Sequence, residues 1–360
     1  MKRRTFLQKS SKAALALALP QGNCRSGKRQ LGVALVGLGY YSTDLLAPAL
    51  QLTRHCKLTG IVTGSPHKIP VWQKRYGIKD QNVYSYETMS RIADNPDIDV
   101  IYIVLPTGLH AKYAIMAANT GKAVWCEKPM ARTAKECQAI IKACQQNKVP
   151  LSIGYRMQHE PNTRRIMELA KSRPYGQLIS VKAEAGYFDG RSNDHWKLKK
   201  AMGGGAMYDM GVYPVNAMRY ATGLEPIAVR SAVQSTQRPQ IFTEVDETTE
   251  FLLEFPEGIL THGKTSFGKG LNELQVDCKE GWYRLSPFQS YSGVRGRASD
   301  GTQFPADPNN QQARQMDNDA LAIMEQRPVL VPGEEGMKDI RIVEAVYETA
   351  RTGRAVDLRE

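Results

Sequence analysis

The chain has 360 residues, of which 42% are hydrophobic and 23% charged, and its formal net charge is +12 at pH 7. This length favours two domains, since a single core rarely grows beyond about 250–300 residues. The composition excludes collagen, coiled coil and wholesale disorder. Residues 1–30 hold eight lysines and arginines and no acid, so subtracting eight from +12 leaves +4 for the rest. With no basic stripe interleaved with aromatics, nucleic acid is not expected as a partner.

The first 30 residues have the pattern of a targeting segment. Lys2, Arg3 and Arg4 precede a short apolar stretch, Ala13–Leu19, which is far below the ~20 residues that a membrane-spanning helix needs. The paired arginines resemble a twin-arginine export signal; a disordered basic tail is the alternative. We therefore expect residues 1–30 to be signal peptide and linker, the protein to be periplasmic, and no later segment to cross a membrane.

The six cysteines form no C-x-x-C pair, and no cluster of His and Cys has zinc spacing. We expect small core residues rather than a disulfide framework, and no metal site.

Strands and helices alternate from residue 31 to residue 152. This alternation predicts βαβ units and a doubly wound parallel sheet, that is, an α/β dinucleotide-binding domain of the Rossmann type over 31–152. The expected elements are strand Leu31–Val36, helix Leu45–Leu52, strands Lys57–Val62 and Asp99–Leu105, helix Ala111–Asn119, strand Ala123–Cys126, helix Thr133–Asn147 and strand Leu151–Gly154.

The pattern changes over residues 153–360, where longer alternating strands predict an α+β domain with a large, open, mainly antiparallel sheet. A sheet with an open face must be covered, so we expect a homodimer or homotetramer. The last helix should pack back on the first domain. The expected elements are helices 160–172, 205–221, Gln312–Glu325 and Met337–Ala350, and strands Leu178–Tyr187, Ile227–Val233, Glu247–Phe255, Ile259–Phe267 and Leu274–Cys278.

A dinucleotide fingerprint follows the first strand. Gly37, Leu38, Gly39, Tyr40 and Tyr41 precede Ser42 in a G-x-G-x-x-S variant. The first glycine permits the tight turn, the second lets the backbone approach a pyrophosphate, and the small serine allows helix–strand packing. The amides at the start of the next helix would then face the phosphates. The alternative is an ordinary strand–helix turn.

The end of the second strand bears on which dinucleotide binds. NAD binders usually carry an acid there for the ribose 2′-hydroxyl, but residues 63–68 contain none and offer Thr63, Ser65 and Lys68. A hydroxyl and a cation suit a 2′-phosphate, so NADP is expected and NAD is the less favoured cofactor. The alternative is that Lys68 is only a solvated residue opening the next helix.

Two other strand ends face the same crevice. Leu105, Pro106 and His110 lie where the strand Asp99–Leu105 enters a helix; His110 would line the nicotinamide pocket or, as we favour, have a structural role. Glu127 and Lys128 follow the strand Ala123–Cys126. A lysine at such a strand end would stabilise an alkoxide on a bound substrate.

The stretch 203–213 carries three glycines, which imply close backbone approach. Asp209 and Tyr213 stand four residues apart and so share a helix face. An acid beside a phenol can organise a proton relay; an exposed Asp and a core Tyr are the alternative.

Together these stretches resemble the glucose–fructose oxidoreductase and inositol dehydrogenase family, and its glucose–fructose branch most. The resemblance runs from Leu31 to the end. It rests on the fingerprint, on the helix carrying Asp209 and Tyr213, and on the motifs Cys126–Met130, Ile153–Arg156, Val245–Thr248 and Pro332–Met337.

The resemblance implies a Rossmann domain followed by an open-sheet domain, with Lys128, Asp209 and Tyr213 at the catalytic centre. Tyr213 replaces the histidine of most relatives, as is typical of the glucose–fructose branch, which is exported by the twin-arginine route and holds NADP tightly. That branch's well-known member has a long proline-rich arm, whereas here only residues 20–30 link signal and domain. We therefore expect the cofactor to exchange measurably.

We expect an NADP-dependent oxidoreductase that transfers hydride between the nicotinamide and a small sugar or polyol, by oxidation of an aldose to a lactone; coupling to ketose reduction stays open. The alternatives are an exported NAD-dependent glycosidase and a non-catalytic dinucleotide sensor. Arg156 is expected at the cofactor and, with Tyr155, His159 and the segment Tyr187–Trp196, in the sugar pocket.

Overall fold

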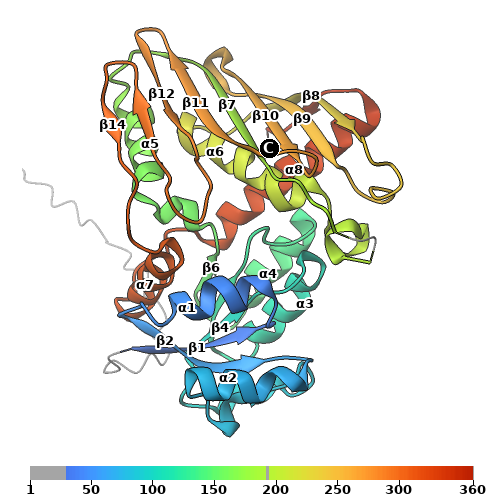
Figure 1. Ribbon diagram of the computed structural model, residues 1–360, viewed down its shortest axis with the longest axis vertical. Helices are drawn as coiled ribbons and strands as arrows, with labels where there is room; N and C mark the ends of the chain where they lie inside the picture. The colour runs from blue at the N-terminus through green and yellow to red at the C-terminus, as the bar shows by residue number, and fades with distance from the viewer. Residues whose placement is uncertain (1–29, 192–193, 360) are drawn as a thin grey trace, which may run out of the picture.

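The computed structural model describes residues 30–191 and 194–359 and shows two sheets, one in each half of the chain (Figure 1). The first sheet is parallel, with the strand order β3-β2-β1-β4-β5-β6. All residues of β1 and β4 are buried, because helices cover both faces. The strands are β1 Leu31–Val36, β2 Cys56–Val62, β3 Val83–Tyr84, β4 Val100–Ile103, β5 Ala123–Cys126 and β6 Leu151–Ile153.

Helices from both ends of the chain cover the parallel sheet. One face packs against α1 (Ala47–Ala49), α2 (Ile69–Tyr76) and α7 (Gln311–Met324). The other face packs against α3 (Thr107–Ala118), α4 (Ala134–Gln146) and α8 (Gly333–Thr352). Helix α8 contacts both α4 of the first domain and β8 of the second sheet, so it joins the two halves.

The second sheet has nine strands in the order β14-β13-β12-β11-β7-β10-β9-β8-β15. It is antiparallel except where β10 lies parallel to β7. This exception arises because the chain leaves β7 through α6 and the β8–β9 hairpin before returning alongside it. Its strands are β7 Leu178–Gly186, β8 Ala228–Ser235, β9 Thr248–Glu254, β10 Leu260–Ser266, β11 Leu271–Cys278, β12 Gly281–Leu285, β13 Gly296–Ala298, β14 Gln303–Phe304 and β15 Val356–Asp357; helices α5 (Pro161–Ser172) and α6 (Val212–Thr222) complete the domain.

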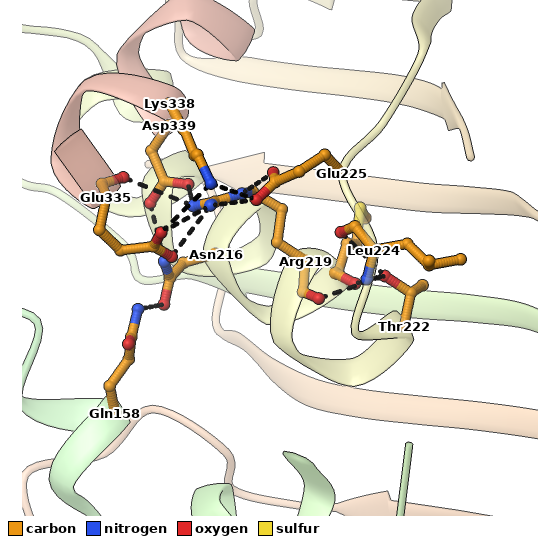
Figure 2. Close-up of polar contacts among 10 residues, drawn as sticks. Gln158, Asn216, Arg219, Thr222, Leu224, Glu225, Glu335, Lys338 and Asp339 are labelled. Carbon is orange, nitrogen blue, oxygen red and sulfur yellow. Dashed lines mark hydrogen bonds and ion pairs between the residues drawn. The ribbon is translucent and has the colours of Figure 1, made fainter. Parts of the chain in front are cut away.

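Helix α6 is tied to α8 by a buried ionic network (Figure 2). The Arg219 guanidinium donates to Asp339 at 2.6 Å, to Glu335 at 2.9 Å and to both oxygens of Glu225. The Asn216 amide, one turn earlier, donates to Asp339 at 2.9 Å. Because Arg219 and Asp339 are both buried, their charge-assisted hydrogen bond holds α6 against α8, while Glu225 and Glu335 lie nearer the surface.

Several boundaries differ from the sequence expectation, including the start of α8 at Gly333 rather than Met337, and three differences lie near the strand ends or α6. Helix α3 begins at Thr107 rather than at Ala111. Its first turn packs closely against the backbone of Ala201, because a Cβ at Gly108 would lie only 2.6 Å from the Ala201 carbonyl oxygen. The helix after β1 starts as a wide, π-type turn, Tyr41–Leu46, and ends at Ala49. A similar π-type turn, Met207–Gly211, precedes α6; such turns often accompany functional sites.

The described cysteines are all free: Cys56, Cys126, Cys137 and Cys144 are buried and Cys278 is partly buried. This confirms the expected core role for those five, whereas the predicted export signal, with Cys24, lies outside the described residues. Within the described ranges, no helix is long and apolar enough to cross a membrane, and no group of three or more His, Cys, Asp or Glu side chains is arranged to hold a metal ion.

Candidate active site

The fingerprint turn is tight on its inner side and open on its outer side. Gly37 has a φ of +94°, and a Cβ there would lie 2.4 Å from the Val104 carbonyl oxygen, so β1 and β4 meet only because the residue is glycine. At Gly39, by contrast, a Cβ would meet no heavy atom within 4 Å. The buried Ser42 hydroxyl donates to the Gly37 carbonyl at 2.6 Å. The turn therefore fits a pyrophosphate that approaches at Gly39.

The residues expected at the 2′-phosphate lie beside this turn. The Lys68 ammonium reaches across from the end of β2 and donates to the Leu38 carbonyl at 2.7 Å. Thr63 is buried and its hydroxyl accepts from the Ser65 amide at 3.0 Å, which closes the turn after β2. Tyr40, in the fingerprint itself, is 64% exposed. A cation at this edge, with no acid in residues 63–68, fits the extra phosphate of NADP.

His110 joins two of the strand-end turns. It is buried, with Nδ1 2.9 Å from the Pro129 carbonyl oxygen and Nε2 2.7 Å from the Leu105 carbonyl oxygen. Burial lowers the pKa of His110. Leu105 and Pro106 are half-buried, and Leu105 packs against Gly37. His110 thus braces the turns behind the crevice, the structural role that the sequence favoured for it.

Lys128, Asp209 and Tyr213 meet at the carboxyl end of β5. The Lys128 ammonium donates to the Asp209 carbonyl at 2.9 Å, lies 4.0 Å from Asp209 Oδ1 and sits 4.5 Å from the centroid of the Tyr213 ring. Asp209 comes from the π-type turn before α6 and Tyr213 from the first turn of α6. The cation therefore bridges the acid and the phenol.

The charges in this cluster favour an ionised Asp209, a protonated Lys128 and a Tyr213 that ionises more readily than a free phenol. Burial alone would raise the pKa of Tyr213, but Lys128 and Arg156 bring it below the usual phenol value. Burial likewise opposes ionisation of Asp209, yet Lys197 and Lys128 hold its pKa at about 2. The pKa of Lys128 is raised by Tyr213 and Asp209, which outweigh burial. Because the charged lysine favours ionisation of the phenol, the Tyr213 phenolate can take a proton from a hydroxyl group.

Glu127 lies behind Lys128. Its carboxyl group accepts from the Tyr102 hydroxyl at 2.5 Å and from the Lys128 amide at 3.2 Å. Burial raises the pKa of Glu127 to about 7. A Cβ at Gly154 would lie 2.6 Å from Glu127 Oε1, so the glycine of the next strand end makes room for this carboxyl group. Glu127 supports the catalytic turn from within the sheet.

Arg156 anchors a loop of the second domain over the site. Its buried guanidinium donates to the Ser290 carbonyl at 3.0 Å and lies 5.6 Å from the Tyr213 ring and 4.7 Å from the Tyr291 ring. The Tyr291 ring is 5.9 Å from that of Tyr41 in the turn after β1. The loop between β12 and β13 thus contacts the π-type turn that follows the fingerprint. Tyr291 was missed, because a loop residue carries no periodic signal.

The other residues expected in the sugar pocket divide into two groups. Tyr155 and His159 are 1% and 2% exposed; Tyr155 belongs to the hydrophobic core, and His159 lies against Asn318 of α7. Tyr187 and Arg191 lie at the site: the Tyr187 hydroxyl donates to Asp209 Oδ2 at 3.0 Å and accepts from Arg191 at 2.9 Å.

Lys197 also lies at the site, although the sequence did not predict it. It directly follows the segment Tyr187–Trp196 that was expected to shape the pocket. Its ammonium lies 2.6 Å from Asp209 Oδ2. The glycine run explains its placement, since a Cβ at Gly204 would lie 2.3 Å from the Lys197 carbonyl oxygen and the Gly205 amide donates to that oxygen at 2.8 Å. Lys199 and Lys200 precede the same glycines more closely, so the sequence alone does not single out Lys197.

A parallel-sheet dinucleotide fold whose fingerprint turn faces a Lys–Asp–Tyr cluster defines a nicotinamide-dependent oxidoreductase. Residues 31–155 match the oxidoreductase family with an NAD-binding Rossmann fold, and residues 163–284 match the GFO/IDH/MocA C-terminal domain. The chain belongs to the GFO/IDH/MocA family, as the sequence motifs predicted.

Three relatives illustrate the likeness. The crystal structure of aldose–aldose oxidoreductase from Caulobacter crescentus, complexed with glycerol, is 38% identical and superposes with a TM-score of 0.88 over 92% of this chain and 100% of that one. The NADP⁺-dependent D-xylose 1-dehydrogenase of Haloarcula marismortui is 29% identical over 90% of this chain and 92% of its own. The NADP⁺-dependent D-xylose 1-dehydrogenase 2 of Haloferax volcanii is also 29% identical, over 91% of this chain and 98% of its own.

Proposed function

We propose that the protein is an NADP-dependent oxidoreductase that transfers hydride between the nicotinamide and a sugar or polyol, by oxidising an aldose to its lactone. The observation that carries the proposal is the Lys128 ammonium held between Asp209 and the Tyr213 ring, at the strand edge that also carries the fingerprint turn. The relatives named for aldoses and for D-xylose support the sugar, and two of them support NADP.

When bound, the cofactor supplies a nicotinamide that accepts or returns hydride. The chain's own residues handle the proton. Tyr213, ionised to a phenolate that Lys128 stabilises, takes the proton of the sugar hydroxyl and becomes a neutral phenol, and Lys128 stabilises the developing alkoxide. Asp209, fixed in its ionised form, accepts a hydrogen bond from a neighbouring hydroxyl and orients the sugar. A free phenol titrates near ~10, so the lowered pKa of Tyr213 is what makes it a usable base.

The cofactor would be held by three groups of residues. The turn Gly37–Tyr41 would receive the pyrophosphate, and Lys68 with Thr63 and Ser65 would lie at the 2′-phosphate. Leu105 and Pro106, between β4 and α3 at the same edge of the sheet, would be the third group.

Two further properties belong to the proposal. The paired arginines of the first segment support export to the periplasm in folded form, and replacing Arg3 and Arg4 by Lys is expected to leave the protein in the cytoplasm. Val233 and Leu260 are 65% and 45% exposed on the open face of the second sheet, which supports a homodimer or homotetramer through that face. Sedimentation of only monomer at micromolar concentration would contradict the assembly.

The activity is tested by incubating the purified protein with a panel of aldoses and polyols, each with NADP⁺ or NAD⁺, and following nicotinamide absorbance. We expect at least one aldose to reduce the nicotinamide cofactor, and to reduce NADP⁺ faster than NAD⁺. If aldose oxidation is coupled to ketose reduction, adding a ketose should reoxidise the reduced cofactor. Release of nitrophenol from chromogenic glycosides without net reduction would instead indicate the glycosidase. Binding of NADP⁺ without any hydride transfer would indicate a sensor.

A further inference from the structure

Asp209 lies between two lysines that contact it differently. Lys197 approaches carboxylate oxygen Oδ2 to 2.6 Å, whereas Lys128 stays 4.0 Å from Oδ1 and gives its hydrogen bond to the Asp209 carbonyl instead. Both ammonium groups are largely shielded, with side-chain exposures of 18% and 14%. The carboxylate charge is therefore neutralised mainly by Lys197.

The position of Lys197 is itself fixed. Its ammonium lies 3.1 Å from the Tyr187 hydroxyl, and that hydroxyl donates to the same carboxylate oxygen. Arg191 donates to the Tyr187 hydroxyl and lies 2.6 Å from the buried Asp189 carboxylate. The glycine run holds the Lys197 backbone from the other side. An arrangement with this many partners is preorganised before any substrate arrives.

We infer that Lys197 is a positioning residue for the reaction: it draws the Asp209 carboxylate away from Lys128, so that Lys128 remains over the Tyr213 ring. The inference rests on the proposed function. Lys197 need not touch the sugar, because its effect reaches Tyr213 through Asp209 and Lys128.

The physical reason is a competition between two ion pairs. Without Lys197, Lys128 is the nearest cation to Asp209, and the strongly favourable pair of opposite charges would close the 4.0 Å gap. Lys128 would then stabilise the carboxylate rather than the phenolate, and Asp209, with one neighbouring lysine instead of two, would further oppose ionisation of Tyr213. Both changes raise the pKa of Tyr213 and shift oxidation to higher pH.

Other charged and titratable groups act on the same pair, and all of them are still present in a variant at position 197, although Tyr187 loses its contact with the Lys197 ammonium. Those that face Asp209 and Tyr213 are Tyr41 after β1, Glu127 and Lys128 after β5, Arg156 after β6, Tyr187, Asp189, Arg191 and His195 after β7, and Tyr291 after β12.

The test compares Lys197→Met, Lys197→Arg and the control Lys199→Met. Lys199 is two residues away and pairs with the exposed Glu244, 3.7 Å distant. For Lys197→Met we expect kcat/KM for aldose oxidation to fall by about 10- to 100-fold near neutral pH. The loss should be partly recovered as pH rises, because the basic group now titrates about one unit higher. Lys197→Arg should restore most of the rate, and Lys199→Met should match the parent. The affinity for NADP⁺ should change little in all three.

A second readout does not depend on activity. The pKa of Tyr213 can be measured from the ¹³C resonance of its phenol carbon, assigned by the loss of that resonance in Tyr213→Phe. We expect a higher pKa in Lys197→Met than in the parent. An unchanged Tyr213 pKa, or a pH profile of Lys197→Met that is lower but parallel to the parent's, would overturn the inference. Absence of sugar oxidation in the parent, together with a raised Tyr213 pKa in the variant, would overturn the proposed function and leave the positioning intact.

Discussion

The two ends of helix α6 both place charges in the protein interior, but they treat them differently. In the last turn of the helix, all three nitrogens of Arg219 are bonded to Glu225, Glu335 or Asp339 (Figure 2). At its start, the Lys128 ammonium has three N–H groups and makes one hydrogen bond within the described residues, to the Asp209 carbonyl. A cation whose nitrogens are all hydrogen-bonded to the protein, which we call saturated, holds elements together. A cation with N–H groups left over can donate them to a substrate or a phenolate. The predictions below test this difference.

The largest effect is expected from removing the catalytic cluster itself. General acid–base groups contribute about 10²–10⁴-fold, so Tyr213→Phe and Lys128→Ala should lower kcat for aldose oxidation by at least that much. Because neither residue lies at the fingerprint turn, fluorescence titration with NADPH should give a Kd close to the parent's. Near-full turnover in Tyr213→Phe would show that another group is the base.

At the end of α6 that carries Arg219, a substitution should lower the free energy of unfolding and leave the catalytic rate largely unchanged. Arg219→Met leaves Asp339, which is fully buried, without its cation; breaking a buried pair in this way costs about 3–5 kcal/mol. Urea denaturation should show this loss, while the folded variant keeps most of its kcat. The matched control is Arg230→Met, whose half-exposed side chain pairs with Glu254 and should change the free energy of unfolding by about 0–1 kcal/mol.

Glu127 makes the stability of the catalytic end depend on pH. Its pKa in the fold, about 7, lies above the ordinary value of 4.5, so the fold favours the protonated carboxyl group. Stability is therefore lost as the pH rises from about 4.5 through 7, where the folded group must ionise. Glu127→Gln removes this cost, so its free energy of unfolding relative to the parent should rise by about 1–3 kcal/mol between about pH 5 and pH 8. A constant difference across that range would contradict the assignment.

An effect of similar size concerns the choice of cofactor. A charge-assisted contact is worth about 1.5–3 kcal/mol, or roughly tenfold or more in affinity, so Lys68→Ala should raise the Kd of NADP⁺ by that factor. The Kd of NAD⁺, which lacks the 2′-phosphate, should stay nearly constant. Lys74→Ala, in the exposed part of α2, is the control. An equal rise in the Kd of NADP⁺ and of NAD⁺ would contradict this prediction, because it would place Lys68 at the pyrophosphate that both cofactors share.

Much of the fold was predictable because its signals are local. The unbroken apolar runs of β1 and β4, and the glycines after β1, are sufficient to place a parallel sheet and its crevice. The parallel pairing of β7 with β10 was not predictable, since it depends on a connection through α6 and a hairpin. The role of α7 in covering the first sheet is likewise set by packing between residues far apart in the chain.

The candidate site shows the same division. Lys128, Asp209 and Tyr213 carried signals at strand ends and at helical spacing, and the structure brings them together. Lys197 and Tyr291 were missed because their roles depend on where the backbone after β7 and after β12 folds back, which no local pattern records.

The central claim is that this chain moves hydride from a sugar carbon to the nicotinamide. The most direct measurement is mass spectrometry of the cofactor after incubation of the protein and NADP⁺ with an aldose deuterated at C1. We predict that the reduced cofactor carries one deuterium per molecule in the parent and that almost no reduced cofactor forms in Tyr213→Phe. Reduced cofactor without deuterium, or equal labelling in Tyr213→Phe, would contradict the account.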